Sequence, residues 1–120
     1  MHEMGMANSI LEAVTRELSR YPGTRGTKVG VRIGELAAID PESLRFCFDA
    51  LARDTILEGL ELETEFCPRR HRCDVCSITF DVHDYEFCCP RCATSETKCV
   101  GGDELELTYL EVEEYESSAI

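Results

Sequence analysis

The chain has 120 residues and a formal net charge of −12 at pH 7, with 43% hydrophobic and 30% charged residues. This composition is typical of a folded protein rather than a disordered one, and the length allows one domain or a small domain with a metal-stabilised module. No apolar stretch approaches the roughly 20 residues that span a bilayer, and the acidic balance argues against general binding to nucleic acid.

Two helices and a strand are predicted in the first half of the chain. Apolar residues at helical spacing predict a helix over residues 6–20, and Pro22 ends it because proline cannot continue a helix. Alternation of polar and apolar residues predicts a strand over 28–33. A second helix should start beside Asp40, whose carboxylate suits the cap, with Pro41 in the first helical position.

Two more alternating segments, 60–66 and 104–112, predict strands on either side of a cysteine-rich stretch. Seven of the eight cysteines fall between these two segments. We therefore expect an α+β fold in which two helices cover a three-stranded sheet, with the cysteine-rich part inserted. The expected domains are 1–66 plus 100–120, and the inserted 67–99.

The charges are unevenly distributed between these parts. Residues 67–99 contain five basic and five acidic residues, whereas residues 100–120 contain seven acidic residues and no basic one. The opening Met-His-Glu-Met-Gly has neither the basic region nor the apolar core of a signal peptide. We therefore expect a cytoplasmic protein, in which cysteines stay reduced.

Two C-x-x-C units predict a single four-cysteine metal site. They are Cys73–Cys76 and Cys89–Cys92, with twelve residues between them. Zinc prefers four soft ligands at tetrahedral corners, and a spacing of two residues lets one turn direct both sulfurs at the same ion. Four protein ligands leave no open position, so the site should be structural, with one Zn²⁺ per chain in a zinc-ribbon-like domain.

The metal itself has an alternative. The second unit, Cys89-Pro90-Arg91-Cys92, also resembles a rubredoxin knuckle, in which iron would replace zinc. The short gap between the units suits a zinc ribbon better, so zinc is the favoured metal.

The remaining cysteines and the histidines near the knuckles are interpreted as ordinary side chains. We expect buried or packed thiols at Cys47 and Cys88. Cys67 and Cys99 flank the insertion and would approach each other if the flanking strands are neighbours, but two reduced thiols are the simpler expectation. His71 and His83 are spare ligand candidates, with exposed histidine as the favoured interpretation.

The amino terminus offers a second set of metal ligands. Met1, His2 and Glu3 bring an α-amine, backbone amide nitrogen and an imidazole within two residues. Such nitrogen donors suit Ni(II). On spacing alone, however, a surface histidine is the simpler interpretation of His2.

Three blocks together resemble the HypA family, nickel metallochaperones of hydrogenase maturation. These blocks are Met1-His2-Glu3, the helix start Asp40-Pro41-Glu42-Ser43-Leu44-Arg45-Phe46-Cys47-Phe48, and the two cysteine units. The resemblance implies a nickel domain with an inserted zinc domain. It implies labile nickel held by His2 with the amine of Met1 and the backbone of Glu3, and Asp40 as a further candidate ligand. Family members usually have glycine after each knuckle, where this chain has Ser77 and Ala93.

The resemblance also implies partners, namely a hydrogenase-maturation GTPase and the large subunit of nickel–iron hydrogenase. We expect no catalysis, no nucleic-acid binding, no membrane insertion, and a monomer or weak homodimer. Two alternative functions stay open: an iron electron carrier of rubredoxin type, and a zinc-ribbon adaptor or nucleic-acid-binding module.

Overall fold

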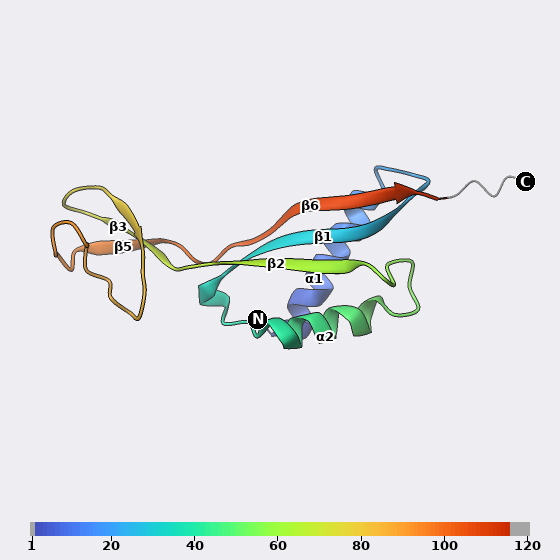
Figure 1. The fold of residues 1–120 in the computed structure, drawn as a ribbon, viewed down its shortest axis with the longest axis horizontal. Coiled ribbons are helices and arrows are strands. Elements are labelled where there is room, and N and C mark those ends of the chain that lie inside the picture. Colours follow the sequence, from blue (N-terminus) through green and yellow to red (C-terminus); the bar gives the residue numbers. More distant parts are fainter. Residues whose placement is uncertain (1, 116–120) are drawn as a thin grey trace, which may run out of the picture. The chain divides into compact units, whose positions relative to one another are not determined.

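A computed structural model describes residues 2–115 of the chain (Figure 1). Its elements in chain order are α1 (Glu3–Leu18), β1 (Thr24–Gly34), the 3-10 helix η1 (Glu35–Ala37), α2 (Pro41–Ala52), β2 (Glu61–Cys67), β3 (Arg70–Cys73), β4 (Thr79–Asp81), β5 (Thr97–Gly101) and β6 (Leu105–Glu114). The strands form two three-stranded sheets, ordered β2-β1-β6 and β4-β3-β5. The predicted α+β class is confirmed.

The starts of the two helices differ in their local chemistry. Asp40 caps α2 by accepting hydrogen bonds from the N–H of Ser43 at 3.1 Å and from its hydroxyl at 2.6 Å. Helix α1 begins at Glu3, earlier than predicted, because Glu3, Met4 and Gly5 are not buried and so add nothing to the apolar stripe that starts at Met6. Among the described residues, no helix is both long and apolar enough to cross a membrane.

The chain folds as two compact units. The first, called the helical unit here, consists of the described residues within Met1–Val31, Ile39–Glu65 and Glu106–Ile120. The second, called the cysteine unit, consists of Arg32–Ala38 and Phe66–Leu105. That these units serve as a nickel domain and a zinc domain stays a prediction.

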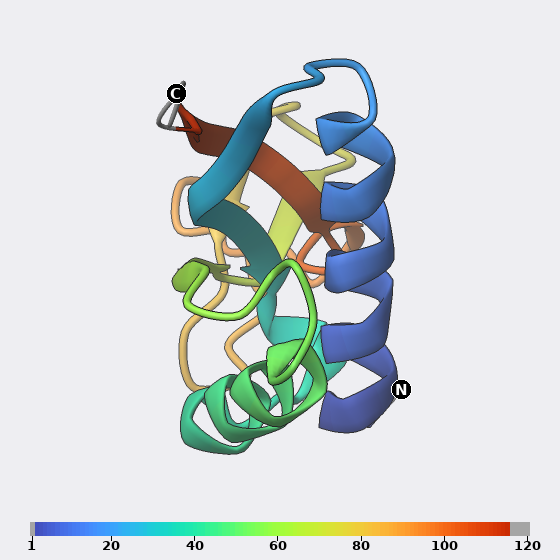
Figure 2. The ribbon, with the colours of Figure 1, turned by 90° about the vertical axis from the view of Figure 1, so that its right-hand side faces the viewer.

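The core of the helical unit joins both helices to alternate residues of β1. Figure 2 shows α1 and α2 beside β1. The most deeply buried core side chains, at most 2% exposed, include Val14 of α1, Leu44 and Phe48 of α2, and Val29 and Val31 of β1. Burial of a side chain of this kind contributes about 1.5–3 kcal/mol, so this core stabilises the packing of both helices.

The opposite face of that sheet carries polar side chains in matched pairs. The ring of Tyr109 lies so close over Gly30 that a Cβ at position 30 would overlap it. The Tyr109 hydroxyl donates to Glu63 at 2.6 Å, and Lys28 forms an ion pair with the same carboxylate at 3.1 Å. On this face, then, a base on one strand meets an acid on its neighbour.

The second sheet was not predicted strand by strand. In β3 the alternation runs through basic residues, a histidine and a cysteine: Arg70 and Arg72 are exposed, whereas His71 and Cys73 are buried. Because aliphatic residues are missing from this pattern, the usual signal of a half-buried strand is missing too.

Candidate metal centres

The four cysteines predicted as metal ligands come together in the cysteine unit. Their sulfurs all lie within 4.8 Å of one another. Cys73 ends β3 and Cys76 lies in the turn that follows, whereas Cys89 and Cys92 lie in the loop before β5. The Sγ–Sγ distances are 3.4 Å between Cys73 and Cys92, 3.6 Å between Cys76 and Cys89, and 3.9 Å between Cys76 and Cys92.

These distances fit a tetrahedral metal site. A metal–sulfur bond of about 2.3 Å places the corners of a regular tetrahedron about 3.8 Å apart. The measured separations lie on both sides of that value. The donor set is therefore the right size for one tetrahedral ion such as zinc, and it leaves no position for a substrate.

Backbone N–H groups in each knuckle point at the first sulfur. Cys73 Sγ accepts from the N–H groups of Val75 and Cys76, each at 3.3 Å, and Cys89 Sγ accepts from Arg91 N–H at 3.4 Å. The Cys76 N–H, together with that of Val75, lowers the pKa of Cys73 to about 6. The knuckles thus stabilise negative charge on sulfur without any side-chain cation.

The four sulfurs do not all ionise easily together. The Thr94 backbone lowers the pKa of Cys92, but interactions with the other sulfurs, Cys73 first, outweigh it and raise that pKa to about 12. A divalent cation removes this conflict, because it replaces the shared protons as the positive charge between the sulfurs.

Each knuckle closes through a residue in the left-handed region. Ser77 follows the first knuckle with φ 67°, and Ala93 follows the second with φ 61°. Their N–H groups donate to Cys73 O at 3.0 Å and Cys89 O at 2.8 Å. These are the positions where the resembling family usually has glycine, and residues with a Cβ adopt this conformation at a cost of roughly 1–2 kcal/mol.

His71 is buried, at 5% exposure, and both of its ring nitrogens are occupied. Arg69 Nε donates to Nε2 at 2.9 Å. Nδ1 lies 2.9 Å from Thr97 Oγ1, which itself donates to Phe87 O at 2.7 Å, so Nδ1 carries the hydrogen. Burial, reinforced by the Arg69 charge, lowers the pKa of His71. This neutral ring, with both nitrogens hydrogen-bonded, has no free lone pair to offer a metal. We expected an exposed histidine, and the structure shows that this expectation was wrong.

The ring of His71 also organises the loop that carries the second knuckle. It stacks on the ring of Phe87, with centroids 5.2 Å apart and an interplanar angle of 10°. The guanidinium of Arg69 also lies over the Phe87 ring, 4.4 Å from its centroid. Arg69, Phe87 and Thr97 were missed by sequence reasoning. They are far apart in the chain, and no spacing rule connects them.

The other four thiols are Cys47, Cys67, Cys88 and Cys99. All eight cysteines lie outside disulfides. Cys47 is half-buried on α2, whereas Cys88 and Cys99 are exposed, so Cys88 is not the packed thiol that we expected. His83, two residues after β4, is exposed, as its favoured interpretation predicts.

The candidate nickel ligands gather where α1 and α2 begin. Met1 lies outside the described residues. His2 is exposed and occupies the cap position of α1 without a side-chain cap hydrogen bond. Glu3 Oε2 accepts from the backbone N–H of Asp40 at 3.1 Å, and this hydrogen bond lowers the pKa of Glu3. The structure therefore brings Glu3 and Asp40 together, with the Asp40 carboxylate already engaged by Ser43.

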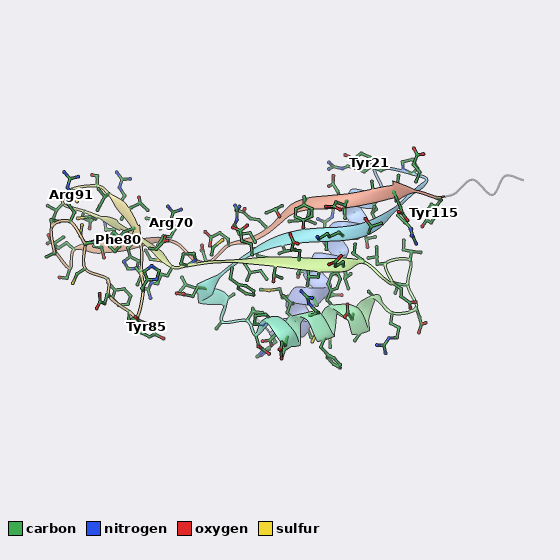
Figure 3. The ribbon with its side chains drawn as sticks, viewed as in Figure 1. Tyr21, Arg70, Phe80, Tyr85, Arg91 and Tyr115 are labelled. Atoms are coloured by element: carbon green, nitrogen blue, oxygen red, sulfur yellow. The ribbon has the colours of Figure 1, made fainter. Side chains whose placement is uncertain are left out.

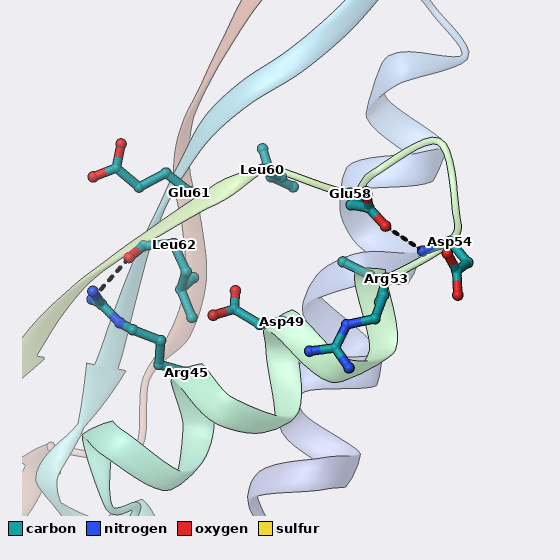
Figure 4. Close-up of a pocket in the computed structure, with 10 residues that line it drawn as sticks. Arg45, Asp49, Arg53, Asp54, Glu58, Leu60, Glu61 and Leu62 are labelled. Carbon is teal, nitrogen blue, oxygen red and sulfur yellow. Dashed lines mark hydrogen bonds between the residues drawn. The ribbon is translucent and has the colours of Figure 1, made fainter.

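A hollow between α2 and β2 is a weaker candidate site. It has a volume of about 620 Å³ and is lined by both acids and bases (Figure 4). Arg45 there donates to Leu62 O at 3.1 Å, and the Asp54 N–H donates to Glu58 at 2.6 Å. Two of its charged side chains, Arg45 and Glu58, thus serve local contacts, and none of the predicted metal ligands lines the hollow.

Comparisons with known proteins agree on one family. The family model described as "Hydrogenase/urease nickel incorporation, metallochaperone, hypA" matches residues 1–112. The protein named Hydrogenase maturation factor HypA of Pelodictyon phaeoclathratiforme is 39% identical over 114 residues, covering 95% of this chain and 97% of the relative. The protein of the same name from Geobacter metallireducens is 38% identical over 113 residues, covering 94% and 100%.

Two solved structures share the fold. The solution structure of the Ni metallochaperone HypA from Helicobacter pylori has a TM-score of 0.66 at 21% identity, covering 92% of this chain and 97% of that one. A second solution structure, of a HypA protein, has a TM-score of 0.68 at 23% identity, covering 92% and 95%.

Proposed function

Because this chain belongs to the HypA family of nickel metallochaperones, we propose that it binds Ni(II) at its amino terminus and delivers it during maturation of nickel–iron hydrogenase. The proposed ligands are the imidazole of His2, the amine of Met1 and the backbone of Glu3, with Asp40 as a further candidate. The observation that carries this proposal is the junction of the two helix starts, where Glu3 accepts from Asp40 N–H.

The geometry at the start of α1 suits a site that binds and releases. The first N–H groups of a helix have no intrahelical partner, so a metal that uses backbone nitrogen there breaks no helical hydrogen bond. The positive end of the helix dipole opposes a cation, while the carboxylates of Glu3 and Asp40 favour it. These opposing effects support a labile site rather than a permanent one.

The second part of the proposal is that Cys73, Cys76, Cys89 and Cys92 hold one structural zinc ion. Its support is the tetrahedral spacing of the four sulfurs. When bound, zinc supplies a cross-link between two loops and no reaction chemistry. A purified protein should be colourless, whereas visible absorption by thiolate-to-iron charge transfer would contradict zinc.

The proposed partners follow from the family. Relatives are named hydrogenase maturation factors, and we infer that this chain hands nickel to a maturation GTPase and to the hydrogenase large subunit. We also propose that it does so without catalysis of its own, in the cytoplasm, and as a monomer or weak homodimer.

A nickel titration of untagged protein tests the terminal site. We expect His2→Ala and a variant with residues added before Met1 to lose tight nickel binding, while zinc stays near one per chain. His83→Ala is the matched control, because it removes an exposed histidine from the cysteine unit. Unchanged nickel affinity in both terminal variants would contradict the assignment. Nickel binding should also weaken in mild acid, since the amine and imidazole must lose their protons.

A further inference from the structure

Basic side chains gather on the outer face of the sheet β4-β3-β5. Along β3, Arg70 and Arg72 are exposed, whereas His71 and Cys73 point to the buried side. The strand register places Arg72 directly opposite Lys98 of β5. Because residues opposite each other share a face, these three bases form one surface, called the basic face here: Arg70, Arg72 and Lys98.

Two arginines of the cysteine unit lie on the same side of it. Arg70 and Arg91 extend toward the same side of this unit in Figure 3, and Tyr85 extends from the opposite side. Tyr85 lies between two acidic residues in the sequence, Asp84 and Glu86. The bases of the basic face number three, and the acids that form ion pairs with them number two, Asp81 and Asp74.

The three bases of this face differ in how far they are neutralised. Like charges directly opposite each other destabilise a sheet. Arg70 has an ion pair with Asp81 at 3.5 Å and Lys98 has one with Asp74 at 3.9 Å, all between largely exposed side chains. Arg72 forms no ion pair with any residue from 2 to 115. On the other sheet, by contrast, Lys28 and Glu63 pair at 3.1 Å.

The metal site does not account for this arrangement. Backbone N–H groups of Val75, Cys76 and Arg91 already donate to the sulfurs. Cys73 is buried on one face of β3 and Arg72 is exposed on the other, so the arginine charge lies across the sheet from that sulfur. A side chain that served to neutralise the thiolates would lie on the same face of β3 as Cys73.

We propose that the basic face docks an acidic segment of a partner protein. Charge complementarity is the argument, because the guanidinium of Arg72, unpaired within residues 2–115 and directly opposite Lys98, attracts a short acidic segment and fixes its position. The formal net charge of −12 disfavours a long polyanion such as nucleic acid, or an anionic membrane. This general repulsion favours a short, local run of acidic residues. This docking does not depend on the proposed nickel site.

A binding experiment on the zinc-loaded full chain tests the proposal. The probe is a fluorescein-labelled peptide of alternating glutamate and serine, followed by fluorescence anisotropy at low salt and at about 0.15 M salt. We expect Arg72→Glu to weaken binding about tenfold. Arg20→Glu is the matched control, since it makes the same charge change at a side chain that is 70% exposed in the helical unit, and it should leave binding within about twofold.

Amide chemical shifts and competitors complete the test. Peptide addition should shift the amide signals of Arg70, Arg72 and Lys98 first, and His2→Ala should bind the peptide as the native chain does. Equal weakening by Arg20→Glu would overturn the proposal as a general charge effect. So would equally tight binding of a single-stranded DNA oligonucleotide to the same residues. Loss of zinc from a folded Arg72→Glu variant would assign the bases to the metal site instead.

Discussion

Replacing Ala93 by glycine should tighten zinc binding. Ala93 closes the second knuckle at φ 61°, is exposed, and donates its N–H to Cys89 O at 2.8 Å. The left-handed conformation costs a residue with a Cβ roughly 1–2 kcal/mol. Glycine removes that cost, but it also raises the backbone entropy of the unfolded chain, which stabilises the unfolded state by about 0.4–1 kcal/mol. The net gain in free energy of folding is about 0.5–1 kcal/mol.

Zinc affinity reports this gain because folding of a small metal module is coupled to metal binding. A gain of about 0.5–1 kcal/mol corresponds to roughly two- to fivefold tighter zinc binding. The assay is competition with a chromophoric zinc chelator at fixed pH. Ser77→Gly, at φ 67° in the first knuckle, should change affinity in the same direction.

The matched control is the same substitution in a helix. Ala50 is exposed within α2, where glycine costs about 0.5–1 kcal/mol relative to alanine. Ala50→Gly should therefore lower the thermal stability of the helical signal and leave zinc affinity unchanged. Weaker or unchanged zinc binding in Ala93→Gly would refute the inference that strain is stored at the knuckle.

Three further predictions concern the network around the metal, the cap of α2 and the independence of the units. His71→Phe keeps the ring stack on Phe87 but removes two hydrogen bonds worth about 1 kcal/mol each. Zinc affinity should therefore fall roughly 5- to 30-fold. The control His83→Phe, at an exposed histidine, should leave zinc affinity unchanged. The pKa of Asp40 is held below its ordinary value by the Ser43 hydroxyl and N–H, so its stabilisation of α2 is present above about pH 3.9 and is lost as the pH falls through the lower folded pKa. Amide exchange at Ser43, followed against pH, should accelerate there, and Asp40→Ala should show fast exchange at every pH. Cys73→Ala should lose zinc and increase amide exchange across residues 67–99, while circular dichroism still shows α1 and α2; loss of all helical signal would contradict the two-unit fold.

The helical unit was largely predictable because its signals are local. Apolar periodicity indicates α1, and Asp40 with Pro41 indicates the start of α2 through cap chemistry that needs only neighbouring residues. The four-cysteine cluster was predictable for the same reason, since each C-x-x-C unit is one turn and tetrahedral coordination joins two of them.

The supporting structure of the cysteine unit was not predictable in this way. Strands β3 and β5 pair residues about 27 positions apart, as His71 with Cys99 and Cys73 with Thr97, and their side chains lack aliphatic alternation. The His71 hydrogen bonds join Arg69, just before β3, to Thr97 of β5, and the ring stacks on Phe87 of the intervening loop. Only the folded chain shows that this histidine is buried, and so its expected exposure was wrong.

The occupied nitrogens of His71 leave the metal site without a reserve donor on that side. If an oxidant converts one of the four thiolates to a sulfur acid, the neighbouring imidazole must first give up Arg69 or Thr97 before it can replace the lost ligand. Under oxidative stress the site should therefore not pass through a mixed sulfur–nitrogen coordination that involves His71.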